Sequence, residues 1–295
     1  AFSASRRWAS EGYVQGTLYD AYSLFGSVEY QFNRRNNISI TSISASNRRG
    51  RSAALTEEVF ELVGNRYNPY WGEQDGKIRN ARERKVMEPI FLLNYIHESE
   101  KIEWKTGLGY QTGVNKRSRL GYFNAPNPDP TYYKYVPSYH INSPLGADFI
   151  NASLAKEAFL ENPQLSWDQM YAANQNTEGA AAYLLSDDVT EDKTITANST
   201  FKYRISTPME MAVGIHYKST NSANYALLTD LLGAEFHSDL DTFSNTQNDT
   251  GGSLQKIEQD KFGYNYGLES ALLGGFGQFQ STFKKWSAFA SVAFS

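Results

Sequence analysis

The sequence contains no cysteine among its 295 residues. A disulfide-stabilised scaffold, a cysteine-based zinc site and a thiol enzyme are therefore excluded. No run of about eighteen apolar residues occurs, so we expect no transmembrane helix. The formal net charge of −4 comes with no basic stripe, and a nucleic-acid partner is not expected.

Histidine is scarce, and the common catalytic motifs are missing. The four histidines show no metal-ligand spacing: His97, His140, His216 and His237. No nucleophile elbow, zinc-protease, dinucleotide-binding or P-loop pattern is present. One stretch hints at a calcium loop, but Ser244 occupies the position that requires glycine. Its oxygen-bearing residues are Asp239, Asp241, Asn245 and Asp249. We expect no cofactor, no resident metal and no enzymatic activity.

Aromatic residues, in contrast, are abundant. They make up 14% of the chain, with 20 Tyr and 5 Trp, and 40% of the residues are hydrophobic. Tyrosine and tryptophan suit interfaces, including the headgroup region of a membrane. The mean hydropathy of −0.54 is compatible with a membrane barrel, because lumen-facing residues and large loops dilute the average. The chain starts at Ala1 without a Met or a signal peptide, so we expect a mature or truncated chain.

The stretch from Thr194 to Lys218 shows the clearest pattern. Apolar side chains occupy alternate positions on both sides of a turn at 206–208. Successive side chains of a strand point to opposite faces, so the pattern predicts a hairpin with one apolar and one wet face. Each arm is about eleven residues long, which is close to what a tilted strand needs to cross a bilayer. We expect Val213 to face lipid and Gly214 to face inward, with Ile215 and His216 repeating the alternation.

The same alternation recurs along the chain and predicts about nine strands. Their expected ranges are 2–8, 21–32, 38–47, 87–97, 102–114, 194–205, 209–218, 271–284 and 286–294. A change of phase between Ile40 and Ile43 predicts a β-bulge in the third strand. Helices are expected at 56–63, near 152–161 and at 167–173, with capping residues Thr56 and Ser166.

The connections between these strands alternate between very short and long. The short ones are 33–37, 98–101, 206–208 and 284–285, and the long ones include 48–86, 115–193 and 219–269. In an antiparallel meander every second connection lies at the same end. All short turns should therefore lie at one end and all large loops at the other, which is the asymmetry of outer-membrane barrels. The sequence predicts an all-β fold, an antiparallel transmembrane β-barrel with long extracellular loops, in which residues 1–295 form part of one domain.

Three stretches in the long connections carry distinctive motifs. They are Asn68–Gly72 (NPYWG) followed by Gly76–Arg82 (GKIRNAR), Asn124–Tyr133 (NAPNPDPTYY) followed by Pro137–Tyr139 (PSY), and Asp260–Tyr266 (DKFGYNY). These motifs resemble extracellular-loop signatures of TonB-dependent receptors of Bacteroidota. Both SusC-like receptors and relatives with an N-terminal carboxypeptidase-regulatory-like domain are open as subgroups. The resemblance implies an integral outer-membrane location, a barrel of about 22 strands occluded by an N-terminal plug, and import driven by an inner-membrane TonB complex.

The chain departs from that family pattern in several ways. It shows no plug domain, no segment for contact with TonB, and about nine strands rather than the full set. We therefore expect an internal piece of the barrel wall with its outer loops. Its expected partners are the TonB complex, reached through the missing N-terminal part, membrane lipid, and a SusD-like surface lipoprotein or another outer-membrane protein.

Binding is the function that the loops favour. Aromatic faces with a few charges nearby suit stacking and hydrogen bonding of a peptide or an oligosaccharide. The candidate ligand-binding residues are Tyr70, Trp71, Asp75, Arg79, Arg82, Tyr132, Tyr133, Tyr135, Tyr139, Trp167 and Tyr171. These rings are equally compatible with packing of the loops onto one another. The favoured function is a TonB-dependent receptor that imports a nutrient. A passive porin or structural barrel, and then a soluble β adhesin, are the alternatives.

Overall fold

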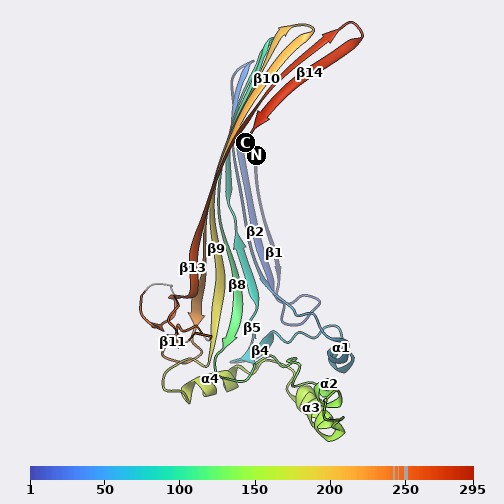
Figure 1. Ribbon diagram of the computed structural model, residues 1–295, viewed down its shortest axis with the longest axis vertical. Coiled ribbons are helices and arrows are strands. Elements are labelled where there is room, and N and C mark those ends of the chain that lie inside the picture. The colour runs from blue at the N-terminus through green and yellow to red at the C-terminus, as the bar shows by residue number, and fades with distance from the viewer. Residues whose placement is uncertain (242, 245, 249–251) are drawn as a thin grey trace.

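A computed structural model describes residues 1–241, 243–244, 246–248 and 252–295. Ten strands form one long sheet, which runs the length of the molecule (Figure 1). They are β1 (Phe2–Ala9), β2 (Tyr19–Asn33), β3 (Asn36–Gly50), β6 (Glu83–Met87), β7 (Ile90–Glu98), β8 (Ile102–Tyr122), β9 (Tyr183–Ser206), β10 (Met209–Asp230), β13 (Lys261–Phe283) and β14 (Trp286–Phe294). Every strand pair in it is antiparallel, so the expected all-β antiparallel architecture is confirmed.

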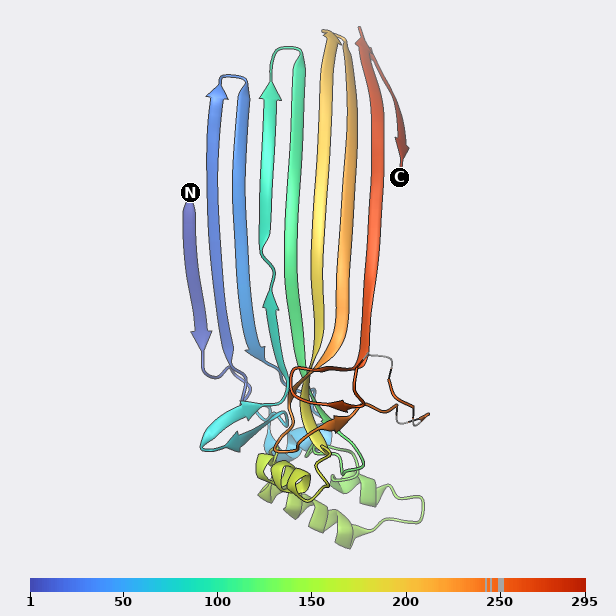
Figure 2. The same cartoon turned by 90° about the vertical axis from the view of Figure 1, so that its left-hand side faces the viewer.

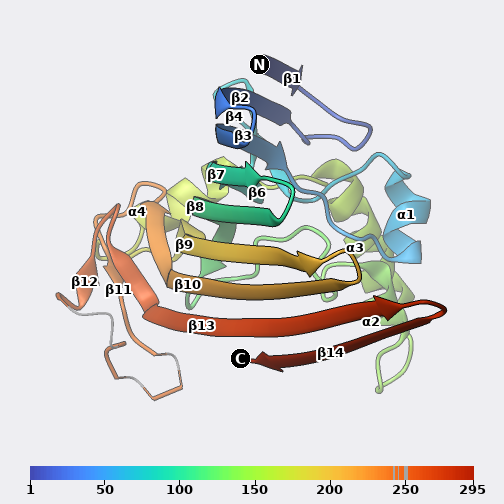
Figure 3. The same cartoon turned by 90° about the horizontal axis from the view of Figure 1, so that it is seen from above.

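The sheet is an open meander with β1 at one edge and β14 at the other (Figure 3). Strands β6 and β7 both lie between β3 and β8, so the ten strands fill the nine expected positions. The break between them falls at Glu88 and Pro89. Proline has no N–H to give to a ladder, which explains the break. The expected strand at 87–97 corresponds to β7, whereas β6 lies almost wholly in the stretch 48–86 that was expected to be a loop.

Four of the strands that run into the large loops are much longer than predicted. Strands β8, β9, β10 and β13 contain 21, 24, 22 and 23 residues, against the expected eleven or so. Strand β9 starts at Tyr183 rather than at the expected Thr194. The sequence did not reveal this extension, because the loops bury Leu184, Leu185 and Val189, and the alternation of apolar and polar residues is lost there. The predicted bulge is also wrong: β3 pairs with β2 and β7 in unbroken register from Ile38 to Ile43, so the two isoleucines face opposite sides.

The short turns and the large loops lie at opposite ends of the sheet, as the sequence predicts (Figure 2). The large loops hold the helices α1 (Glu57–Val63), α2 (Pro137–Ile141), α3 (Phe149–Glu161) and α4 (Trp167–Gln175). They also hold two small hairpins, β4 (Trp71–Gln74) with β5 (Lys77–Asn80), and β11 (His237–Ser238) with β12 (Gln255–Lys256). We call this set of loops the cap. None of the helices in the described part of the chain is both long and apolar enough to cross a membrane.

Side-chain capping explains three of the four helices in the part of the chain that the structure describes. Thr56 accepts a hydrogen bond from the backbone N–H of Val59 at the start of α1, and Ser166 accepts one from Gln169 at the start of α4. Both caps confirm the predicted helix starts. Helix α3 begins three residues before its expected start, where Asp148 accepts from the backbone N–H of Asn151. The single-turn α2 was not predicted, since Pro137 at its first position lies in a proline- and tyrosine-rich stretch.

The buried cores lie in the cap and the strand ends next to it. One joins α4 to the strands through Leu165, Trp167, Met170 and Leu185, and a second gathers Leu184, Leu228 and Phe262. A third packs α1 against α3 through Val59, Tyr67 and Phe159. The cap is therefore a folded layer with its own apolar packing rather than a set of loose loops.

Candidate ligand-binding site

The half of the sheet near the short turns carries an exposed apolar band on one face. Residues directly opposite in an antiparallel pair share a face, and Tyr110, Ile195 and Ser219 form one such row while Trp104, Phe201 and Val213 form another. On β9 the band runs from Ile195 to Ile205, a depth of about eleven residues. A tilted strand that crosses a bilayer needs about 9–11 residues.

A row of polar side chains ends this band on the cap side. Lys193, Asn221 and Glu269 lie next to one another on β9, β10 and β13, and all three are exposed. They share the face of Ile195 and Phe201, two and eight positions further along β9. The apolar surface therefore stops at a sharp edge, and the strands continue for about ten residues beyond it to reach the cap.

At the level of the apolar band, the opposite face of the sheet carries ion pairs. Glu103 lies opposite Lys202, and its carboxylate is 2.6 Å from Lys105 Nζ and 3.7 Å from Lys202 Nζ. Lys105 also approaches Glu98 at 3.8 Å. These groups are partly exposed, and such pairs contribute little to stability in water. Their value here is diagnostic, because charges of both signs on one face and apolar groups on the other suit a sheet between water and lipid.

In the cap, each of the stretches Asn68–Gly72 and Gly76–Arg82 contributes one buried asparagine that has a structural role. Asn68 and Asn80 each donate a side-chain N–H to the carbonyl oxygen of Arg51, at 3.1 and 3.0 Å. Asn68 also donates to Gln15 and Asn80 to Gly16. Both side chains are buried, so these bonds hold three separate segments of the cap together.

The predicted site residues of the same region mostly share this structural role. Arg79 donates to Asp230 Oδ2 at 2.5 Å and to Gln74 at 2.6 Å, and its guanidinium lies 4.3 Å from the ring of Trp167. Trp167 is fully buried, and Tyr171 lies within 3.5 Å of Arg79 Nη1. The structure thus brings Arg79, Trp167 and Tyr171 together, but as internal packing.

Trp71, Asp75 and Tyr70 differ in their surroundings. Trp71 is half-buried and packs against Gly16, where a Cβ would lie 2.2 Å from its ring. Asp75 and Gly76 both have positive φ, at 50° and 71°, which is the geometry of a two-residue hairpin turn between β4 and β5. Tyr70 lies under Arg82, with 5.6 Å between guanidinium and ring, and both line a hollow of about 280 Å³. Tyr70 and Arg82 therefore border an open hollow, whereas the surroundings of Trp71 and Asp75 are those of packing and of a turn.

The four tyrosines between 132 and 139 form a continuous chain of rings. Ring centroids are 4.7 Å apart for Tyr132 and Tyr133, 5.3 Å for Tyr132 and Tyr135, and 5.6 Å for Tyr133 and Tyr139. His140 extends the chain at 5.3 Å from Tyr139. Each pair is edge-to-face, an arrangement that aromatic rings prefer. Tyr133, Tyr135 and Tyr139 are exposed, so this ladder of rings is accessible from solvent.

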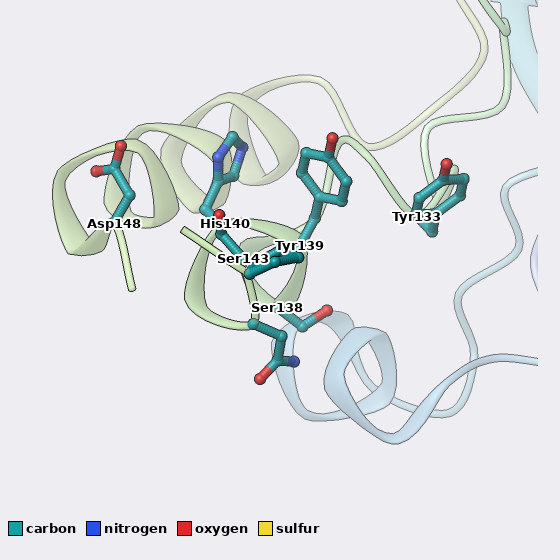
Figure 4. A pocket seen from close by; sticks show the side chains of 8 residues that line it. Tyr133, Ser138, Tyr139, His140, Ser143 and Asp148 are labelled. Atoms are coloured by element: carbon teal, nitrogen blue, oxygen red, sulfur yellow. The ribbon is translucent and has the colours of Figure 1, made fainter. Parts of the chain in front are cut away.

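A hollow of about 400 Å³ lies beside the ladder, lined by Tyr133, Tyr139, His140 and Asp148 among others. Figure 4 shows these four side chains projecting to the same side of the chain. The pKa of Asp148 lies below its ordinary value, because the backbone and side-chain N–H groups of Asn151 bond its carboxylate and His140 lies nearby. Asp148 is therefore ionised at neutral pH. Ser138 donates its hydroxyl to Glu58, which ties this wall to α1.

A second hollow of about 470 Å³ is also lined by His140. Its walls include Lys134, Tyr135 and the α3 residues Leu154, Ala158 and Phe159. His140, Asp148 and the α3 residues were missed by sequence reasoning. A histidine directly after Tyr139 was a usable signal, whereas the position of α3 beside the ladder depends on its packing against α1 and is not visible in the sequence.

Asn174 is a further residue that the sequence did not reveal. It is 1% exposed and donates to the carbonyl oxygens of Tyr183, Leu231 and Leu232 at 2.8–3.1 Å. Its own side-chain oxygen accepts from the backbone N–H groups of Ala182 and Tyr183. These five bonds join α4 to β9 and to the segment after β10.

Within the described ranges, no group of three or more acidic, histidine or cysteine side chains is placed to hold a metal ion. Two of the residues that hinted at a calcium loop, Asn245 and Asp249, lie outside the described residues. Asp239 is buried and accepts from the side chain of Asn248 and the backbone of Gly263. It therefore serves to hold the loop that follows β11.

No family model and no curated protein matches the chain. It is similar to the crystal structures of the ferric-catecholate import receptor Fiu from E. coli K12. The closed form is 7% identical with a TM-score of 0.46 over 99% of this chain and 45% of that one. The open form is 11% identical with a TM-score of 0.41 over 94% and 35%. The chain thus spans less than half the length of either.

Proposed function

We propose that the chain is part of the wall and outer cap of a TonB-dependent outer-membrane receptor that imports a nutrient such as a peptide or an oligosaccharide. One observation carries the proposal: an apolar band about one bilayer deep ends at the row of Lys193, Asn221 and Glu269, with short turns on one side and a folded cap on the other. The loop motifs resemble those of Bacteroidota receptors of the SusC-like or carboxypeptidase-regulatory-like type, which supports the same assignment.

The cap favours a receptor over a passive pore. Ordering a residue costs on the order of 1–2 kcal/mol of backbone entropy, and the cap adds three buried clusters and four helices to offset that cost. A diffusion pore gains nothing from such a layer, whereas a receptor uses it to capture a scarce ligand. Inward release of a tightly held ligand then requires work, which in this family comes from the TonB complex.

The proposed receptor needs further polypeptide to complete its wall. The two edge strands β1 and β14 present unpaired backbone groups, and lipid offers no partners for them. We propose that additional strands and a plug close and occlude the barrel, that lipid covers the apolar band, and that the short turns lie in the periplasm. A SusD-like lipoprotein or another outer-membrane protein is a further proposed partner, and the proposed role involves binding and transport without a catalytic step.

The test is uptake by cells that express the full-length receptor. A panel of radiolabelled oligopeptides and oligosaccharides would be supplied to these cells, to cells without the receptor, and to cells without a functional TonB complex. The expected result is receptor-dependent accumulation that disappears without TonB. Accumulation that needs the receptor but is equal with and without TonB would establish the passive-porin alternative. Release of the receptor from cells without detergent would favour the soluble adhesin.

A further inference from the structure

Four hollows of the cap lie in a row. The hollow beside Tyr139 and the next one share His140, and the second shares Pro130, Tyr135 and Asn162 with a third of about 320 Å³. The third shares Asn127, Pro128 and Asp129 with the hollow of Tyr70 and Arg82. A compact ligand occupies a single hollow. A row of hollows with shared walls suits a ligand that is an extended chain of units.

The walls of the second hollow are chemically selective. On the α3 side they are formed by the apolar residues Leu154, Ala155, Ala158 and Phe159, together with Asn151 and, at the end of the helix, Asn162. Sugar hydroxyls placed against the four apolar side chains would lose their hydrogen bonds to water without replacement. Burial of an aliphatic or aromatic side chain against these residues is instead favourable, because it removes apolar surface from water. This wall therefore favours an amino-acid side chain over a sugar ring.

The two ends of the row carry different charged groups, Asp148 at the first and Arg82 together with Asp129 at the last. Asp148 lies at the first end, and two hydrogen bonds to Asn151 leave other lone pairs of its carboxylate open. Arg82 lies at the last end, where its guanidinium stacks on Tyr70 and makes no ion pair within the described residues. Asp129, close to that end, already accepts from the N–H and hydroxyl of Thr131 at 2.8 and 2.7 Å.

We infer that the row binds a short peptide with free termini, its ammonium group at Asp148, its carboxylate at Arg82, and an apolar side chain in the hollow of Leu154 and Ala158. Lys134 and His140 border the middle of the row and face the peptide backbone. This inference deepens the proposed function and rests on it only for the direction of transport, because binding itself needs neither a membrane nor TonB.

The first experiment incubates the purified full-length receptor, in detergent, with a tryptic digest of casein and identifies retained peptides by mass spectrometry. Wild type is expected to retain a subset of short peptides with an apolar residue. Ala158→Trp fills the second hollow and should reduce retention about tenfold or more. Ser153→Trp is the matched control, since Ser153 is exposed on the same helix and lines none of these hollows. Equal retention by both variants, or none by wild type, would overturn the inference.

The second experiment tests the two charged ends with one retained peptide. Calorimetric titrations compare its free form with its N-acetylated and C-amidated forms. Each blocked form should bind wild type about tenfold more weakly, as expected for loss of a hydrogen bond to a charged group. In Arg82→Gln the amidated peptide should bind as well as the free peptide, while the acetylated peptide should still bind more weakly. In Asp148→Asn, which keeps the helix cap, the acetylated peptide should bind as well as the free peptide, while the amidated peptide should still bind more weakly. Unchanged penalties would refute the assigned direction.

The failures of the two proposals are distinguishable. Maltohexaose that binds instead of peptides, with binding lost in Ala158→Trp, would overturn the peptide inference and leave TonB-dependent uptake intact. Peptides that bind as described but accumulate equally without TonB would overturn the proposed function and leave the peptide site intact.

Discussion

Gly214 on β10 lies directly against the ring of Phe276 on β13, so that a Cβ at residue 214 would be 2.2 Å from Phe276 Cε1. Simple alternation predicts that Gly214→Arg is a mild, inward-facing partner for the lipid-facing Val213→Arg. The structure shows that it is not, because any side chain at 214 displaces the phenylalanine. The control must be chosen from another residue of the inner face.

Thr200 is that residue, since it is paired with Gly214 across the hairpin and shares its face. Val213→Arg places a charge in the apolar band and should reduce the unfolding free energy of the lipid-embedded receptor by about 2–4 kcal/mol. Thr200→Arg should change it by less than about 1 kcal/mol. Urea unfolding of full-length receptor in vesicles measures both. Similar losses would show that the apolar band does not face lipid.

Gly72 controls how the β4–β5 hairpin docks on the segment before α4. A Cβ there would lie 1.9 Å from the carbonyl oxygen of Leu165, a backbone atom, and Leu165 itself donates to Trp71. Gly72→Ala should therefore destabilise the cap by about 3 kcal/mol. Gly26→Ala is the control, because nothing lies within 4 Å of its Cβ position. Limited proteolysis of the cap is the measurement, and equal protection of both variants would contradict the expected clash.

Asn174→Ala should loosen α4 from the strands. Removing the amide leaves three buried carbonyl oxygens and two N–H groups without their partner, at a cost of at least about 3 kcal/mol. Asn176→Ala removes one bond to Ala172 from an exposed side chain and should cost less than about 0.5 kcal/mol. Hydrogen exchange of the α4 amides would compare the two variants. Equal exchange rates would show that the hydrogen bonds of Asn174 do not hold α4 on the strands.

His237 makes the β11–β12 hairpin sensitive to acid. Its ring lies between Phe123 at 4.4 Å and Phe262 at 5.1 Å, and burial lowers its pKa, partly offset by Asp239. Lys256, opposite it on β12, is the other buried charge beside it. The imidazole of His237 binds a proton more tightly in the unfolded segment than in the folded hairpin. The contribution of neutral His237 to the stability of the hairpin is therefore fully present above about pH 6.5, and it is lost as pH falls from there through the lower pKa of the folded state.

We expect amide exchange in the hairpin to accelerate below about pH 6.5, beyond the intrinsic pH effect on exchange. His237→Gln should remove the acid dependence, whereas His216→Gln, a change at an exposed residue of β10, should retain it. Acid-dependent exchange that persists in His237→Gln would assign the effect to another group.

Sequence alone predicted the elements whose patterns are local. The Thr194–Lys218 hairpin, the caps at Thr56 and Ser166, and the separation of short turns from large loops follow from alternation, capping residues and connection lengths. The strand extension after Tyr183 did not, because the cap buries both its faces. Within the site, the neighbouring tyrosines were found together, whereas the bond from Arg79 to Asp230 joins residues 151 positions apart, and no local pattern indicates it.

The ten or so residues of strand beyond Lys193 and Asn221 extend the wall by about 33 Å, at about 3.3 Å per residue. In the proposed receptor this extension acts as a stalk that holds the ligand site clear of the lipid headgroups and among the outer sugars of the cell envelope. The connection between α2 and α3 in the cap contains the fully exposed Leu145. An epitope tag inserted there would be displayed to antibodies on living cells, and its position would report on the cap without touching the membrane wall.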